Sequence, residues 1–354
     1  MRKFVLALLA SFLSFIINAK VIFAVNKPQL GTDRVLVIVN NEPILASEFD
    51  AIFYPALTKF KQISSNAGQT KIKVNELRNF ILNQQIEYIL LRQEAKRLGI
   101  KVTTNEIQDQ INQFRKIFNS EYEFNNELKK NHLTIDILKS SIKERLIIAR
   151  LIQRSVNNKV KKPTDVDIRS FYNRVVKYLL SSPKGKQELA QNKDIITTAQ
   201  GLKRLLSEHI KVRQIFVSVP KNVSVAQKKA IQTKLNNIKS ALHKHQSFSS
   251  IALKYSDSPN NGNWGIIYIN DLPSKISNRI FNMKVGNCTL DPIQTGNGYH
   301  FVKVEEKYAK KDINYNNSKK YLSDILYFNR LQKAYNEYIK SLRAKANIKI
   351  NKSL

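Results

Sequence analysis

The sequence predicts an α+β fold in which helical segments flank one compact, glycine-rich module. Five of the ten glycines fall between residues 212 and 306, among short β-type runs: Gly262, Gly265, Gly286, Gly296 and Gly298. Glycines in such positions mark tight turns between strands and helices. Before and after this module, apolar residues recur at spacings of three and four, which is typical of helices packed on one face. We therefore expect an α/β module between helical segments.

The first 24 residues have the pattern of a secretory signal peptide. Two basic residues precede an apolar run over residues 4–17, which is short for a span across a bilayer. Small residues follow, and we expect cleavage after Ala24, with Ala19 as the alternative. An uncleaved membrane anchor is the other interpretation of this run. The single cysteine, Cys288, excludes an intramolecular disulfide. The mature protein is expected to be exported.

The formal net charge of +32 raises the question of nucleic-acid binding. The lysines are spread over every segment without a dense block, and export separates the protein from nucleic acid. We therefore expect no nucleic-acid partner but a solvated surface whose positive field attracts acidic clients or an anionic membrane surface. No cofactor and no metal are expected, because no metal-ligand spacing occurs. His243 and His245 lie two apart on a predicted helix and point in different directions.

Residues 33–50 predict a β-hairpin followed by a helix, because valines alternate up to an Asn-Asn turn. Apolar stripes then predict three or four helices between residues 77 and 152, one of them opened by a Thr103–Glu106 capping box. A further helix is expected over residues 321–346, with a short strand after it. We interpret each stripe as core packing.

Within the module, β-branched and aromatic residues over 212–219 predict the first strand. A capping-box signature at Ser224 and Gln227 opens a long helix, and a shorter helix follows it. Residues 298–304 alternate as a half-buried strand after a Gly-Asn-Gly turn.

Four motifs of the module, in this order, resemble those of parvulin-type peptidyl-prolyl isomerases. They are the strand motif Arg213–Phe216, the Phe-x-x-Leu-Ala-x-x-x-Ser-like segment Phe248–Ser256, the glycine turn Gly262–Ile266, and the closing segment Gly286–His300, which ends in Gly-Tyr-His. The resemblance covers about a hundred residues and implies a peptidyl-prolyl cis-trans isomerase domain.

The segment TDRVLVIVNNEPILASEFD at residues 32–50 resembles the start of SurA-like periplasmic chaperones. In that family a C-terminal helix packs on the N-terminal helices, and the isomerase module is an insertion, which compact domains tolerate when their ends lie close. The resemblance implies a helical N-terminal domain completed by a C-terminal helix, with an inserted parvulin-like α/β domain. The best-known relatives carry two parvulin domains, and this chain has room for one. The expected division is a signal peptide (1–24), an N-terminal helical chaperone domain (25–160), linker helices (161–210), a parvulin-type domain (211–308) and a C-terminal helix (309–354).

The parvulin resemblance also implies a site with two histidines, a Cys or Asp near them, and an apolar seat for the proline ring. His300 matches the second histidine, and Thr295 matches the polar residue before it. Gln214 stands in place of the first histidine, and Ser258 in place of the Cys or Asp. A hydrogen-bonded core histidine is the other interpretation of His300. The predicted catalytic residues are His300, Gln214 and Ser258, and the predicted substrate-binding residues are Trp264, Leu272, Ile276, Thr295 and Phe301.

These features predict a periplasmic, monomeric folding chaperone for unfolded outer-membrane or secreted polypeptides. Its isomerase is expected to be weak, because several pocket residues are replaced. The alternative is a fully active exported isomerase that acts on proline-limited folding. An extracellular foldase of the PrsA type is disfavoured, since no cysteine lies where a lipid would be attached. Residues 175–209 form a longer stretch than the family leads us to expect, and no role is predicted for it.

Overall fold

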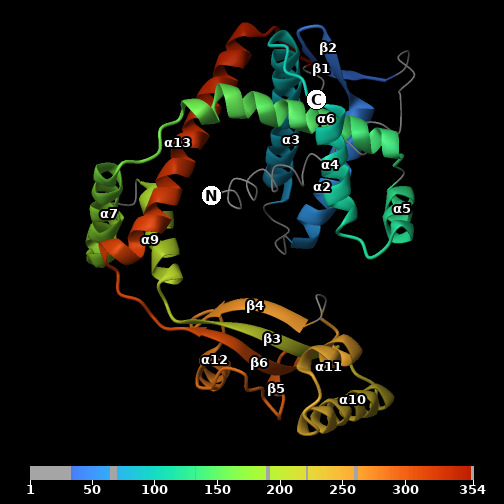
Figure 1. The fold of residues 1–354 in the computed structure, drawn as a ribbon, viewed down its shortest axis with the longest axis vertical. Coiled ribbons are helices and arrows are strands. Elements are labelled where there is room, and N and C mark those ends of the chain that lie inside the picture. The colour runs from blue at the N-terminus through green and yellow to red at the C-terminus, as the bar shows by residue number, and fades with distance from the viewer. Residues whose placement is uncertain are drawn as a thin grey trace. The chain divides into compact units, whose positions relative to one another are not determined.

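The computed structural model describes residues 33–63, 70–131, 133–188, 192–220, 222–258 and 262–351, and the predicted signal peptide lies outside them. The chain divides into two units, Met1–Lys162 with Tyr327–Leu354, and Pro163–Leu326. Figure 1 shows their helices and strands. Among the described residues, no helix is both long enough and apolar enough to cross a membrane.

The first unit is mainly helical. Its elements are β1 (Val35–Val39), β2 (Glu42–Leu45), α2 (Ala46–Ile63), α3 (Thr70–Arg97), α4 (Thr104–Arg115), α5 (Glu121–Lys130), α6 (Ile135–Ser155), a 3-10 turn (Asn157–Lys159), the second part of α13 (Tyr315–Lys345) and β7 (Ile348–Ile350). The capping box at Thr103 and Glu106 is confirmed. Thr103 accepts a bond from the third amide of α4, and Glu106 accepts one from the cap amide, so two helix-end donors are satisfied.

A small antiparallel sheet joins the beginning and the end of the chain. Its order is β2-β1-β7, and β1 pairs with β2 through the predicted Asn-Asn turn. Asn40 adopts a φ of 56° there, a conformation that asparagine tolerates better than most residues. The C-terminal strand β7 pairs with the other edge of β1. The predicted hairpin and the short strand after the last helix are both confirmed.

The second part of α13 completes the core of the first unit. Ile339 and Leu342 are buried in it together with side chains of β1, α2, α3 and α6. On the rim of this contact, the Arg343 guanidinium donates to Asn83 Oδ1 at 3.1 Å and to Glu87 Oε1 at 3.2 Å. The expectation that a C-terminal helix completes the helical domain is confirmed.

The first part of α13 packs in a different core, that of the second unit. Leu322 is fully buried against α7 (Asp165–Leu180) and α9 (Lys193–Leu205), which follow one another in the chain with the short α8 (Pro183–Glu188) between them. Gly201 permits this contact, since a Cβ on it would lie 2.1 Å from the Tyr321 hydroxyl. The segment that was expected as linker helices therefore has an apolar core of its own, to which the C-terminal helix contributes.

The rest of the second unit is the predicted α/β module. An antiparallel sheet of order β4-β3-β6-β5 has α10 and α11 on one face and α12 on the other. The predicted α+β fold and the Ser224–Gln227 capping box at the start of α10 are confirmed. The elements are β3 (His209–Ser218), α10 (Val225–His243), α11 (Phe248–Tyr255), β4 (Asn263–Tyr268), α12 (Ser274–Phe281), β5 (Ile293–Thr295) and β6 (Gly298–Tyr308).

Candidate active site

The two central strands of the module decide which side chains meet. β3 and β6 pair antiparallel, with Phe216 opposite His300 and Gln214 opposite Val302. Because successive side chains of a strand point to opposite faces, all four lie on the α12 face of the sheet. The alternate residue, Phe301, points into the core under α10 and α11.

A chain of hydrogen bonds runs across this face. Ser258 Oγ accepts from the Gln214 side-chain amide at 3.4 Å. Gln214 Oε1 lies 3.2 Å from His300 Nδ1, and His300 Nε2 lies 2.9 Å from the Thr295 hydroxyl. Three of the predicted polar residues and the predicted threonine are thus joined, although they come from four separate segments of the chain.

Burial lowers the pKa of His300 from its ordinary value of 6.5, so the ring is neutral at pH 7 and carries one N–H. With the Gln214 amide in this orientation, Nδ1 donates to Gln214 Oε1, and Nε2 accepts from the Thr295 hydroxyl. Thr295 Oγ1 also lies 3.1 Å from the Gly298 carbonyl oxygen. If the ring tautomer changes, Thr295 donates instead to the Gly298 carbonyl oxygen or to Asn297 Oδ1, which lies 2.5 Å from its hydroxyl, and the Gln214 amide must turn over.

The loop after α11 holds Ser258 at the site. The amide of Asp257 donates to the Phe216 carbonyl oxygen at 2.8 Å, and the amide of Phe216 donates to Ser256 Oγ at 3.1 Å. The loop then returns over β3 at Gly262, where φ is +77°. A Cβ at Gly262 would lie 2.5 Å from the Gln214 carbonyl oxygen. Only glycine allows this close approach.

Apolar side chains surround the polar chain. The Trp264 ring stacks on His300 with centroids 5.7 Å apart and an interplanar angle of 15°. Leu272 and Ile276 are half-buried and pack on the same core as Trp264. This arrangement can seat an apolar ring next to a neutral, hydrogen-bonded imidazole.

Two placements differ from the sequence-based expectation. Phe301 is fully buried on the opposite face of the sheet, so it cannot line a seat near His300, and the expectation for it was wrong. Phe216 was not predicted, yet its ring centroid lies 4.8 Å from that of His300. The period of two along β3 places it on the face of Gln214 and could have identified it.

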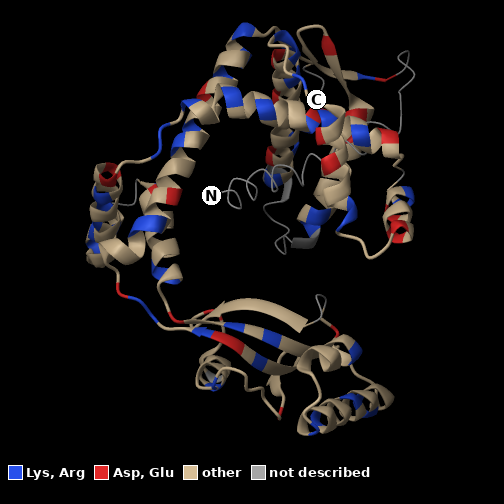
Figure 2. Cartoon of the chain, viewed as in Figure 1, with Lys and Arg blue, Asp and Glu red and all other residues tan. Residues whose placement is uncertain are grey.

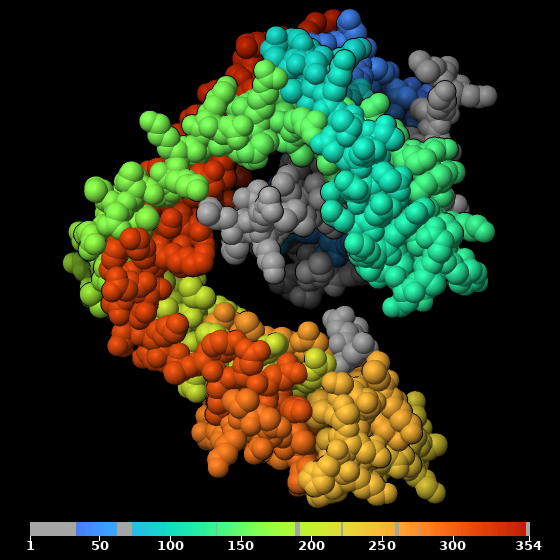
Figure 3. All heavy atoms as spheres, viewed as in Figure 1, coloured from blue at the N-terminus to red at the C-terminus, as the bar shows by residue number. Residues whose placement is uncertain are grey.

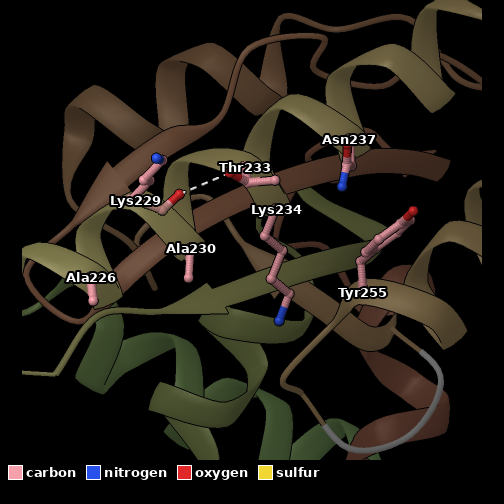
Figure 4. A pocket seen from close by; sticks show the side chains of 7 residues that line it. All are labelled: Ala226, Lys229, Ala230, Thr233, Lys234, Asn237 and Tyr255. Atoms are coloured by element: carbon pink, nitrogen blue, oxygen red, sulfur yellow. Dashed lines mark hydrogen bonds between the residues drawn. The ribbon is translucent and has the colours of Figure 1, made fainter.

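An open, shallow hollow of about 560 Å³ lies on the surface between α10 and Tyr255 of α11 (Figure 4), on the other face of the sheet from His300. The chemistry of the hydrogen-bonded chain, and not the size of a cavity, therefore identifies the candidate site.

The chain is similar to known proteins along most of its length. Residues 215–306 match a family described as a PPIC-type PPIase domain, and residues 1–152 match one described as a SurA-like N-terminal domain. A protein named Chaperone SurA from Polaromonas sp. is 26% identical over 283 residues, which are 79% of this chain and 54% of that protein. A second one, from Idiomarina loihiensis, is 22% identical over 308 residues, which are 85% of this chain and 62% of that protein.

Among solved structures, a SurA-like chaperone of Campylobacter jejuni aligns with a TM-score of 0.37 and 17% identity, over 90% of this chain and 99% of that chain. The chain spans between half and two thirds of the length of the two curated relatives named above.

Proposed function

Because the chain carries a SurA-like N-terminal domain and a PPIC-type peptidyl-prolyl isomerase domain, we propose that it is an exported folding chaperone for unfolded outer-membrane or secreted polypeptides. The helical unit binds unfolded chains, and the α/β module binds prolyl segments and isomerises them weakly. We propose that it acts without a cofactor, in the periplasm, and as a monomer. The proposed domains are residues 25–160, 211–308 and 309–354, joined by the helices of 161–210.

The proposal of weak isomerisation rests on the hydrogen bond between Gln214 and His300. Rotation about an X–Pro bond requires the amide to lose its planarity, against a barrier of about 18–20 kcal/mol. Polar groups beside the bond lower this barrier when they favour the twisted amide. Gln214 does not titrate near neutral pH, and Ser258 is neutral. His300, Gln214 and Ser258 therefore present a weaker field to the amide than charged groups would.

Peptide binding does not need that field. Trp264, Leu272, Ile276 and the newly identified Phe216 offer apolar surface around His300, and Thr295 fixes the ring through its hydroxyl. We propose that these residues seat the proline ring. Binding and isomerisation are then separable properties of one site.

Exposed apolar residues of the helical unit support the proposed binding of unfolded chains. Tyr54 on α2 is 58% exposed and Phe80 on α3 is 53% exposed. Ile117 and Tyr122, around the turn between α4 and α5, are 74% and 75% exposed. Unfolded β-rich chains expose long apolar segments and aggregate unless these are covered.

A fully active isomerase is the second candidate. The placement of His300, with both ring nitrogens engaged and an aromatic ring stacked on it, favours this alternative. Two assays on the same preparation separate the candidates. One measures the aggregation of a denatured porin with and without the protein, and the other measures cis-to-trans isomerisation of a short prolyl peptide. The proposal expects suppressed aggregation with slow isomerisation, and unchanged aggregation of the porin contradicts it.

A further inference from the structure

Within the described residues, the last part of β3 has a neighbouring strand on one side only. β6 pairs with β3 as far as Ser218, whereas the pairing with β4 ends at Arg213. On the open side lies the loop after α11, which offers side-chain oxygens instead of a strand. The Phe216 amide donates to Ser256 Oγ at 3.1 Å, and the Ser218 amide donates to Asp257 Oδ2 at 2.9 Å. The loop thus satisfies two edge donors of the strand.

The carboxylate of Asp257 joins three parts of the module. Its Oδ2 also accepts from the Ser218 hydroxyl at 3.2 Å, and its Oδ1 accepts from Lys234 Nζ at 2.5 Å. Ser218 ends β3, and Lys234 belongs to α10. The carboxylate therefore ties the loop both to the strand that carries Gln214 and to a helix outside the candidate site.

Lys234 is carried by a well-packed helix pair. α10 and α11 share a core that includes Ile238 and Ile251, and in Figure 3 their yellow atoms form one continuous block. Figure 2 shows lysines but no acidic residue on α10, so an acidic partner for Lys234 has to come from another segment. Figure 4 shows the Lys234 side chain extended away from its helix. Asp257, just after the end of α11, is the partner that it reaches.

The Asp257 carboxylate is charged at neutral pH. Burial raises the pKa of Asp257, but the hydrogen bonds from Lys234 and Ser218 outweigh burial, so the pKa lies below its ordinary value of 3.8. Hydrogen bonds to a charged acceptor are shorter and stronger than neutral ones. Both side chains of the pair are partly exposed, and such pairs add little to stability. The effect of this contact is therefore the position that it gives the loop.

That position matters because Ser258 directly follows Asp257. Ser258 Oγ accepts from the Gln214 side-chain amide at 3.4 Å, which is long for a hydrogen bond, so a small displacement of the loop breaks it. We propose that Asp257 is a positioning residue of the candidate site, which holds Ser258 against Gln214 by anchoring the loop to β3 and α10. This role rests on the proposed function, in which Ser258 takes part in isomerisation.

Asp291 provides a matched control on the same helix. Its carboxylate accepts from Lys239 Nζ at 2.7 Å, and within the described part of the chain it bonds neither to β3 nor to the loop after α11. Asp257→Ala and Asp291→Ala therefore each remove one charge and one ion pair with α10. Only Asp257→Ala should release the loop.

The first measurement is amide hydrogen exchange, followed by NMR on the mature, full-length protein. The Phe216 amide is bonded to Ser256 and not to Asp257, so its protection reports whether the loop stays on β3. We expect exchange at Phe216 to be about tenfold faster or more in Asp257→Ala, and to change less than about twofold in Asp291→Ala. Ile215, which pairs with Phe301 of β6, should keep its protection in both variants.

Asp257→Asn is the conservative variant. Its amide oxygen can still accept from the Ser218 amide, so it should restore part of the protection at Phe216. Unchanged exchange at Phe216 in Asp257→Ala overturns the proposal. Equally faster exchange in Asp291→Ala also overturns it.

The second measurement separates positioning from a purely structural role. Cis-to-trans exchange of a short prolyl peptide is followed by NMR with protein in stoichiometric amounts, which detects slow isomerisation. Asp257→Ala should lower kcat about fivefold or more and change the Kd of the peptide less than about twofold. In a Ser258→Ala background, Asp257→Ala should cause no further loss of kcat, because it acts through Ser258. Additive losses overturn the proposal.

Failure of the proposed function has a different signature. Absence of isomerisation in the unmodified protein contradicts the proposed function. Hydrogen exchange at Phe216 needs no catalysis, so it still decides whether Asp257 holds the loop on β3.

Discussion

Nδ1 of His300 lies 3.2 Å from Oε1 of Gln214, so an imidazole and an amide share the bond at the centre of the candidate site. Gln214 is 9% exposed, and burial lowers the pKa of His300. Neither partner is charged at pH 7. The site is therefore a neutral hydrogen-bonded chain against an apolar wall, and the predictions below follow from that character.

The protonation of His300 can be read from fluorescence. Trp264 is the only tryptophan in the chain, and its ring stacks on His300. A protonated imidazole quenches a neighbouring indole, so the emission of Trp264 should fall as His300 titrates. We expect the midpoint to lie below the ordinary histidine pKa of 6.5. The transition should be absent in His300→Gln, and a midpoint above that value would contradict the burial argument.

The same shift predicts how stability depends on pH. The lowered pKa of His300 means that the unfolded chain binds the proton more readily than the folded one. The contribution of His300 to the free energy of unfolding is therefore complete above a pH of about 6.5. It is lost as the pH falls from there through the pKa of the folded state. His300→Gln lacks this loss, so the difference in melting temperature between the two proteins should change on acidification. A constant difference would show that His300 does not titrate differently on folding.

The two parts of α13 should stabilise different regions. Leu322 is fully buried with α7 and α9, and Ile339 is buried in the core of the first unit. Replacing either by Ala removes apolar contacts at a cost of about 2–5 kcal/mol. Hydrogen exchange should show faster opening of α7 and α9 amides in Leu322→Ala, and of β1 and α3 amides in Ile339→Ala. Identical exchange patterns in the two variants would show that α13 acts as one cooperative element.

The seat around His300 includes a residue that the sequence analysis did not identify. Phe216→Ala should weaken binding of a short prolyl peptide about threefold or more, because the aromatic surface beside His300 is lost. Phe301→Leu is the matched control, since it alters the core on the other face of the sheet. It should lower the melting temperature but leave the affinity of the folded protein unchanged. If only Phe301→Leu lowered the affinity, Phe301 and not Phe216 would belong to the substrate-binding site.

The sequence was sufficient for features that depend on local patterns. The Thr103–Glu106 and Ser224–Gln227 boxes, the Asn40 turn and the strand that carries His300 all follow from residue types at fixed spacings. The packing of α13 was harder, because one long helix meets two cores and its periodicity does not say where the partner changes. Phe301 was wrongly predicted to bind substrate because it follows His300 directly in the closing motif. Side chains alternate along β6, so Phe301 points to the opposite face of the sheet. The bond between Gln214 and Ser258 depends on a loop that returns through Gly262, which only the fold reveals.

The central claim is that the module binds prolyl segments but isomerises them weakly, because Gln214 and Ser258 replace groups that act on the twisted amide. The most direct measurement is a cis-to-trans assay on a short prolyl peptide, comparing the unmodified protein with the double variant Gln214→His, Ser258→Asp. Emission of Trp264 reports peptide binding in both. We predict similar affinities, slow isomerisation by the unmodified protein, and a rate at least about tenfold higher in the double variant, which corresponds to about 1.4 kcal/mol in the barrier. Isomerisation by the unmodified protein as fast as that of ordinary parvulins would contradict the account.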